Sequence, residues 1–335
     1  MATPVLELEA VRTTFPMRGA RVPIVDEVSL SVEAGKVLAV VGESGCGKSM
    51  TALSIMRLVP KPGRVDGGRI LLDGRNLLEL SIPEMRAVRG RQIAMIFQEP
   101  MTSLNPVVRV GAQVMEATLL HERVSKQAAR SRGIELFRRV GIPDPEARFD
   151  AYPHQLSGGL KQRVMIAMAL VTRPRVLLAD EPTTALDVTI QAQILELMRE
   201  LSRDFETAIV LITHDLGVVN ALADEIAVMY AGRVIERGSR ATVLGRPEHP
   251  YTRGLLASIP SRNAKGAPLH EIPGVVPAPH AWPRGCRFCT RCERAFEPCE
   301  AVVPRELLLP GAHHVWCHAV ERDRQVESKD AGGKS

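Results

Sequence analysis

The chain has 335 residues, of which 45% are hydrophobic, and a formal net charge of +5. This length suits one domain of ordinary size with an extension, and the hydrophobic fraction is enough for a sizeable core. No apolar run approaches the roughly 18 residues that a membrane-spanning helix needs. Residues 1–7 lack the basic and apolar stretches of a signal peptide. We therefore expect a cytoplasmic chain, and the absence of a long basic run speaks against nucleic acid as a partner.

Residues 42–49 match the phosphate-binding pattern G-x-x-x-x-G-K-[ST] at every fixed position. The apolar run 37–41 predicts a buried strand before this loop, and 50–58 predict a helix after it. Lys48 is placed to reach the β- and γ-phosphates of ATP, and Ser49 to offer its hydroxyl to Mg²⁺. The predicted nucleotide contacts of the loop are Gly42, Glu43, Ser44, Gly45, Cys46, Gly47, Lys48, Ser49 and Met50.

Three further apolar runs predict strands that each end in a polar residue, over 93–97, 176–179 and 209–212. Open α/β sheets bind their ligands outside the carboxyl ends of the strands. Asp180 is predicted to hold Mg²⁺, and Glu181 to polarise the attacking water, with a pKa raised by apolar surroundings. We interpret His214 as a sensor of the γ-phosphate and Gln98 as a bridge to the Mg²⁺ or the water.

Residues 102–155 interrupt the alternation of strands and helices and predict a helical subdomain, inserted over about 100–168. Its clearest helix is amphipathic and covers 125–140. Ser157, Gly158 and Gly159 begin a further helix over 160–171, whose N-terminus presents N–H groups and a positive dipole end. A helix over 189–205 carries a stripe that faces the core.

These residues resemble the ATP-binding cassette (ABC) family. Leu156–Gln162 resembles its signature loop, and Asp180–Asp187 its Walker B segment with the following D-loop. The resemblance implies an α/β fold, a P-loop ABC ATPase domain with a RecA-like core and an inserted helical subdomain. It makes Gln98 the Q-loop glutamine and His214 the switch histidine. It adds these nucleotide contacts: Phe15 on the adenine, Ser157, Gly158, Gly159 and Asp187.

In this family two ATPase domains form a head-to-tail dimer, and each ATP lies between the phosphate loop of one and the signature of the other. Neither motif occurs twice in this chain, so the second domain must come from another molecule.

Within the family the chain is most similar to importers of peptides and nickel, and to their D-type ATPase subunit. The similar segments are residues 98–106, 183–193 and 247–252. The resemblance implies an ATPase that energises uptake of dipeptides or oligopeptides from the cytoplasmic face of the membrane. Its partners would be two transmembrane permease subunits, a second, F-type ATPase or another copy of this chain, and a solute-binding protein. The alternatives are an importer of nickel, glutathione or another solute, and a soluble ABC-type ATPase without a transport role.

Five of the six cysteines lie close together near the C-terminus: Cys286, Cys289, Cys292, Cys299 and Cys317. Disulfides are disfavoured in the cytoplasm, so the cluster indicates zinc, an iron–sulfur centre or unliganded thiols. The family resemblance implies a [4Fe–4S] cluster on Cys286, Cys292, Cys299 and Cys317, with Cys289 as a possible substitute. For Zn²⁺, the additional candidate ligands are His313, His314 and His318.

The predicted domain boundaries follow from these segments. Residues 1–245 form the ABC ATPase domain, and 246–320 an extension with the cysteine cluster. The polar, charged residues 321–335 predict a disordered tail.

Overall fold

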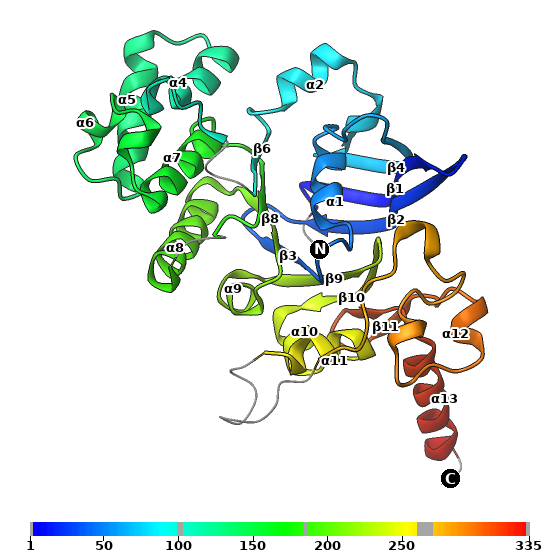
Figure 1. Cartoon of the computed structure of the whole chain (residues 1–335). Coiled ribbons are helices and arrows are strands. Elements are labelled where there is room, and N and C mark those ends of the chain that lie inside the picture. Colours follow the sequence, from blue (N-terminus) through cyan, green and yellow to red (C-terminus); the bar gives the residue numbers. More distant parts are fainter. Residues whose placement is uncertain (1–2, 99–102, 184–186, 260–270, 333–335) are drawn as a thin grey trace. The chain divides into compact units, whose positions relative to one another are not determined.

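A computed structural model describes residues 3–98, 103–183, 187–259 and 271–332 (Figure 1). The chain forms two compact units. The first unit comprises Met1–Glu7, Ser31–Leu38 and Arg69–Ile212, and the second comprises Leu8–Leu30, Ala39–Gly68 and Thr213–Ser335.

Parallel strands form the core of the first unit. Strand β6 (Ile93–Ile96) pairs with β7 (Val176–Asp180), and β7 pairs with β8 (Ala208–Thr213). Every residue of β7 and β8 is buried, as expected for parallel strands covered on both faces. The three strands predicted here from apolar runs are confirmed, and their carboxyl ends meet at one edge. A short strand, β5 (Arg75–Asn76), also belongs to this unit.

Helices make up the rest of the first unit, and α4 to α7 lie together in Figure 1. Their bounds are η1 Leu77–Glu79, α2 Ile82–Val88, α4 Val110–His121, α5 Lys126–Arg139, α6 Pro145–Phe149, η2 Pro153–Gln155, α7 Gly158–Leu170 and α8 Val188–Phe205. Helix α5 begins at Ser125, whose side chain accepts the N–H of Ala128 as an N-cap. Phe137 and Phe149 pack at the centre of this group, with their ring centroids 5.1 Å apart.

Two sets of strands lie wholly or mainly in the second unit. The first has the order β2 (Ala20–Val32), β1 (Leu6–Met17), β4 (Arg64–Leu72). The second has the order β11 (Leu307–Leu309), β12 (His313–Val315), β10 (Arg233–Ser239), β9 (Glu225–Tyr230), β3 (Val37–Val41). Because β12 pairs with β10, with Val315 opposite Glu236, the C-terminal region continues the sheet of the preceding segment.

The helices of the second unit are α1 Lys48–Ile55, α9 Leu216–Leu222, α10 Arg240–Gly245, α11 Pro250–Ala257, η4 Pro279–Ala281, η5 Cys289–Arg291, α12 Pro298–Ala301 and α13 His318–Gly332. The core of this unit joins β3, β9 and α9 to the C-terminal region. Tyr230, Tyr251 and Phe288 pack there ring against ring, with centroids 4.8 to 5.4 Å apart.

Helix α13 differs from the disordered tail expected for residues 321–335, because 321–332 are helical. Charged side chains attach the start of this helix to its surroundings. Asp323 pairs with Arg294 at 2.6 Å, Glu321 pairs with Arg305 at 2.5 Å, and Arg322 lies over the ring of Phe296. Composition alone could not show these partners. Within the described ranges, none of the helices combines the length and the apolar character needed to cross a membrane.

Candidate functional site

The loop from β3 to α1 packs closely against neighbouring backbone, and glycines make this possible. A Cβ on Gly42 would lie 2.2 Å from the carbonyl oxygen of Met229. Gly47 is the N-cap of α1 with φ of 103°, and a Cβ there would lie 2.9 Å from the carbonyl oxygen of Ile24. No other residue fits at either position without displacing a strand. The loop therefore has the geometry that its sequence pattern predicts.

Lys48 lies at the inner side of this loop and is only 7% exposed. Its Nζ donates to the carbonyl oxygens of Gly42 and Glu43, at 2.7 and 3.0 Å. Burial raises the pKa of the adjacent Cys46 thiol, despite the nearby ammonium. Cys46 therefore stays protonated and contributes packing, whereas Ser44 and Gly45 are exposed at the tip of the loop.

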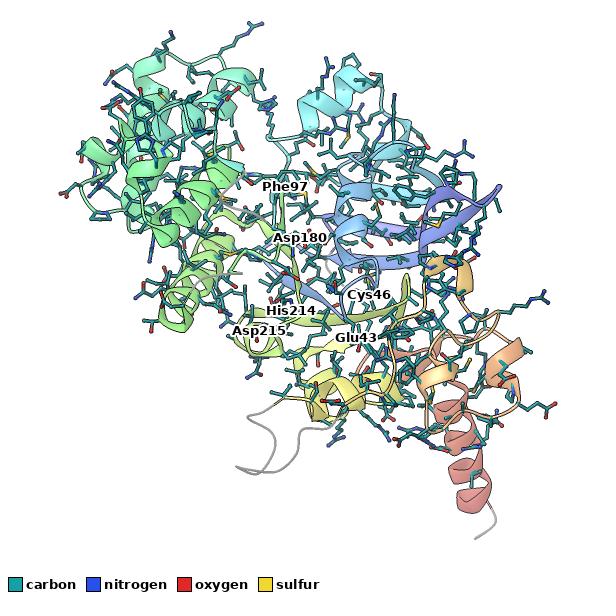
Figure 2. All side chains as sticks on the ribbon, viewed as in Figure 1. Glu43, Cys46, Phe97, Asp180, His214 and Asp215 are labelled. Carbon is teal, nitrogen blue, oxygen red and sulfur yellow. The ribbon has the colours of Figure 1, made fainter. Side chains whose placement is uncertain are left out.

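Glu43 is held by two residues of the C-terminal region. Its backbone N–H donates to the hydroxyl of Tyr251 at 2.8 Å. Its carboxylate accepts two hydrogen bonds from the guanidinium of Arg291, at 2.6 and 3.1 Å. Figure 2 marks Glu43 and Cys46 at this loop. The sequence had indicated Glu43 as a nucleotide contact, but here its N–H and its carboxylate both have protein partners.

Two other predicted residues of the second unit lie outside the loop. The half-buried ring of Phe15 lies against Gly63, where an added Cβ would approach Phe15 Cζ to 2.3 Å. His214 is exposed and directly follows β8. Next to it, Asp215 caps α9 by accepting the N–H of Gly217 at 2.7 Å, and its own N–H donates to Thr213. This tight turn fixes the backbone at His214.

In the first unit, the carboxyl edge of the parallel strands brings two predicted catalytic residues together. Gln98 follows β6, and its Nε2 donates to Oε2 of Glu181 at 3.0 Å. Glu181 follows β7 with φ of 47°, and its N–H donates to Ile212 on β8. Asp180, the last residue of β7, is only 5% exposed. The amide thus orients the carboxylate that was predicted to be the base.

The predicted signature forms the exposed N-terminus of α7. Ser157 is the N-cap and accepts the N–H of Leu160 at 3.4 Å, and a Cβ on Gly158 would meet nothing within 4 Å. Gly159 has little space, because a Cβ there would lie 3.2 Å from Ile190. Asp187 caps α8 by accepting the N–H of Ile190 at 2.9 Å. Residues 184–186, between Walker B and Asp187, lie outside the described residues.

Sequence reasoning missed a buried carboxylate that supports the phosphate loop. Asp26 on β2 is 2% exposed and pairs with Arg12 at 3.0 Å, with Arg233 at 2.8 Å and with Arg287. Burial opposes its ionisation, but Arg287 and Arg233 outweigh burial and keep the pKa of Asp26 below its usual value. Its N–H donates to Gly232, whose N–H donates to Cys46 at 2.8 Å. No local pattern marked Asp26, since its partners come from three distant segments.

A second buried network positions the His-Pro-Tyr segment. Glu236 is fully buried, pairs with His313 at 2.7 Å and accepts the N–H groups of Glu248 and His249. His249 Nδ1 in turn accepts the N–H of Tyr251 at 3.0 Å. Burial lowers the pKa of His249 to about 4, so the ring is neutral. The segment thereby starts α11 and directs Tyr251 to the phosphate loop.

The five C-terminal cysteines are buried or half-buried, and they lie close enough together to interact electrostatically. Burial raises the pKa of Cys286 to about 12, and Cys317, Cys299 and Cys289 add to the shift. Burial also raises the pKa of Cys289, Cys292 and Cys317. As free thiols, Cys286, Cys289, Cys292 and Cys317 hold their protons more firmly than an exposed cysteine, and a metal would have to displace these protons.

The geometry of this region does not support the predicted metal site. In the part of the chain that the structure describes, no group of three or more Cys, His, Asp or Glu side chains is arranged to hold a metal ion. The candidate zinc ligands have other partners: His313 contacts Glu236, His314 contacts Glu306, and His318 contacts the carbonyl of Val302. Neither the iron–sulfur cluster nor zinc gains support from these positions.

Two family models match the chain. One describes the ABC transporter family and matches residues 25–184. The other describes the C-terminal region of oligopeptide and dipeptide transporters and matches residues 235–299. The second match includes Tyr251 and Arg291.

Individual proteins are similar over nearly the whole chain. The dipeptide transport ATP-binding protein DppD of Bacillus subtilis is 48% identical, over 98% of each chain. The oligopeptide transport ATP-binding protein OppD of Salmonella typhimurium is 47% identical, over 92% of each. Among solved structures, the dimeric ATP-binding cassette MJ0796, in a post-hydrolysis state bound to ADP and Pi, has a TM-score of 0.63 at 27% identity. That match covers 70% of this chain and 98% of the other.

Proposed function

The chain belongs to the ABC transporter family of ATP-binding proteins, and we propose that it is the ATPase subunit of an importer for dipeptides or oligopeptides. The observation that carries this proposal is the extent of the similarity. It covers 98% of both chains in the comparison with the Bacillus subtilis dipeptide transport protein. It also includes the C-terminal region that is typical of peptide transporters.

ATP would bind at the phosphate loop of the second unit. The exposed backbone at Ser44 and Gly45 and the ammonium of Lys48 are suited to the triphosphate. Phe15 is proposed to stack on the adenine. Mg²⁺ would be held by Ser49, Asp180 and Gln98 and would neutralise charge that develops on the phosphates. The nearly buried carboxylate of Asp180 and the hydroxyl and amide oxygens of the other two are oxygen donors of the kind that Mg²⁺ prefers.

Hydrolysis is proposed to depend on Glu181 as the base that polarises the attacking water. The hydrogen bond from Gln98 supports this role, because it keeps the carboxylate at the strand edge. His214 would contact the γ-phosphate as charge moves to the leaving group. The chain's own contribution is thus to orient the water and to hold its proton on Glu181.

The complete site would need a second ATPase domain from another molecule. The exposed N-terminus of α7, with Ser157, Gly158 and Gly159, is proposed to contact ATP bound to the partner, with Asp187 at the same interface. The similar cassette MJ0796 is a dimer, which supports this arrangement. We propose an F-type subunit as the partner, and a second copy of this chain is the alternative.

The importer would also contain two transmembrane permease subunits and receive its solute from a separate binding protein. This chain would lie at the cytoplasmic face of the membrane as a peripheral subunit. Peptide transport is named for its relatives, whereas nickel, glutathione or another solute remains the alternative cargo.

The test is co-purification with affinity-tagged permease subunits, followed by reconstitution of the complex into vesicles that contain ATP inside and have the solute-binding protein outside. ATP-dependent uptake of a labelled dipeptide or oligopeptide would support the proposal. Uptake of nickel or glutathione, without uptake of peptides, would show that the importer carries that solute instead. Robust ATPase activity without any association with permeases would favour a soluble, non-transport ATPase.

A [4Fe–4S] cluster on Cys286, Cys292, Cys299 and Cys317, with Cys289 as a substitute, is a separate proposal. The proposal rests on the five cysteines in one short segment of the sequence, whereas the described geometry is not that of a metal site. Iron, zinc and acid-labile sulfide should be measured on protein purified without oxygen. About four irons and four sulfides per chain would establish the cluster. One zinc without sulfide would show a zinc site instead, and the absence of both metals would show that the thiols are free.

A further inference from the structure

Glu43 in the phosphate loop is fixed at three points, and two of them come from the C-terminal region. Its carbonyl oxygen accepts a hydrogen bond from Lys48. Its N–H donates to Tyr251, and its carboxylate binds Arg291. Tyr251 is fully buried and the Arg291 side chain is 5% exposed, whereas the Glu43 side chain is 30% exposed, so the contacts are shielded from water on the side of the C-terminal region.

Arg291 is itself held rigidly. Its guanidinium donates to the carbonyl oxygens of Pro273 at 2.7 Å, Gly274 at 3.2 Å and Ile272 at 3.3 Å. It also lies 5.8 Å from the ring centroid of Tyr230. Together with the two hydrogen bonds to Glu43, these contacts hold the guanidinium of Arg291 in one orientation. Such a planar, preorganised donor loses little freedom when it orients a carboxylate.

The charge on Glu43 is the reason why this contact matters for the nucleotide. A carboxylate within a loop that receives a triphosphate repels it, and water screens this repulsion only in part because the Glu43 side chain is 30% exposed. Arg291 neutralises that carboxylate and turns it toward the C-terminal region. The loop can then present its exposed N–H groups and Lys48 to the phosphates without an opposing charge.

We propose that Arg291, assisted by Tyr251, is a positioning residue for the phosphate loop, and that it acts by neutralising and anchoring Glu43. This inference rests on the proposed function, since it presumes that the loop binds ATP. It assigns the C-terminal region a direct part in nucleotide affinity, through residues 208 and 248 positions away from Glu43 in the chain.

The test is a double-mutant cycle on the full chain, read by equilibrium binding of ATP and by steady-state hydrolysis in the assembled complex. Arg291→Met keeps the aliphatic stem and removes the charge. It should weaken ATP binding and raise KM for ATP about tenfold, with kcat changed less than about twofold. Adding Glu43→Gln to this variant removes the unmasked carboxylate and should return the affinity to within about threefold of wild type.

Arg294→Met is the matched control, because Arg294 lies in the same segment but pairs with Asp323 on α13. It should leave ATP affinity unchanged. If Arg291→Met fails to fold, Arg291→Lys retains the charge without the bidentate contact and should weaken ATP binding about threefold.

An Arg291→Met or Arg291→Lys protein that folds and binds ATP as wild type does would overturn the inference. So would a double variant without recovery, because lost packing would then explain the effect. If the wild-type chain itself bound no ATP, the proposed function would fail instead, which keeps the two failures distinct.

Discussion

The phosphate loop and the edge that carries Glu181 differ in how firmly they are built. The base of the loop is packed by Met229 and Ile24 at its glycines and by Tyr251 and Arg291 at Glu43, whereas its tip at Ser44 and Gly45 is exposed. At the other edge, Gln98 is exposed and reaches Glu181 through one hydrogen bond. On the proposed function, nucleotide affinity would be largely built into this chain, and hydrolysis would depend on partners that complete the second region.

The sharpest test of this comparison is Glu181→Gln, which keeps the size of the side chain and removes the base. We expect ATP hydrolysis in the assembled complex to fall at least about 100-fold while ATP affinity stays within about twofold. Steady-state turnover and equilibrium binding measure the two effects. Glu200→Gln, an exposed position on α8, is the control, and rapid turnover by Glu181→Gln would refute the assignment of the base.

Gly42→Ala should disrupt the phosphate loop and leave the strand edge that carries Glu181 unchanged. Its Cβ would overlap the Met229 carbonyl oxygen at 2.2 Å, and either the loop or β9 must move. We expect a loss of about 2–4 kcal/mol in unfolding free energy, measured by chemical denaturation, with ATP affinity lost as well. Gly45→Ala is the matched variant, because its φ is 79° but nothing lies within 4 Å, and it should cost only about 1 kcal/mol. Equal losses in the two variants would show that packing at Gly42 is unimportant.

The support of the loop should also depend on pH through His249. Burial lowers its pKa to about 4; Arg253 acts in the same direction and Glu236 opposes it. Above pH 6.5 the ring is neutral in both the folded and the unfolded chain. Between pH 6.5 and 4 only the unfolded chain takes up the proton, so stability falls by about 1.4 kcal/mol per pH unit as the pH drops.

His249→Asn retains an acceptor for the N–H of Tyr251 and has no titrating ring. Its unfolding free energy should therefore vary less with pH over this window than that of wild type. The exposed His154, replaced by Asn, is the control. A His249→Asn chain with the wild-type pH dependence would exclude His249 as the titrating group.

Tyr251→Phe is the smallest change that tests the loop. It leaves the ring among Tyr230 and Phe288 but removes the hydroxyl that accepts the N–H of Glu43. We expect a cost of about 1 kcal/mol in unfolding free energy, measured by denaturant titration. Tyr152→Phe, in the first unit, is the comparison. A larger loss at Tyr152 would show that the buried contact at Glu43 contributes little.

Local signals were sufficient to predict the elements that hold the site. The apolar runs predicted the strands that place Gln98, Asp180 and Glu181 at their carboxyl ends, and Ser125 marked the start of α5. The phosphate loop was evident because its glycines, lysine and serine are close in sequence.

The supports of the loop could not be predicted in the same way. Asp26 and Arg291 reach the loop across long stretches of chain, and no local pattern marks their side chains. The segment 247–252 did show a pattern, but the pattern did not reveal that Tyr251 contacts Glu43. The cysteines drew attention to their own segment, yet the residue between them that contacts the loop is Arg291. The described residues 321–332 form a helix because charged side chains at its start pair with Arg294 and Arg305, and composition does not show these partners.

The contact between Glu43 and Arg291 also orders events during synthesis. The two residues are 248 positions apart, so at 5–20 residues per second the ribosome needs roughly 12–50 s to deliver the arginine after the glutamate. Until then the nascent chain exposes a phosphate loop whose carboxylate is unneutralised. On the proposed function, full affinity for ATP would be reached only after Arg291 has been synthesised and has paired with Glu43.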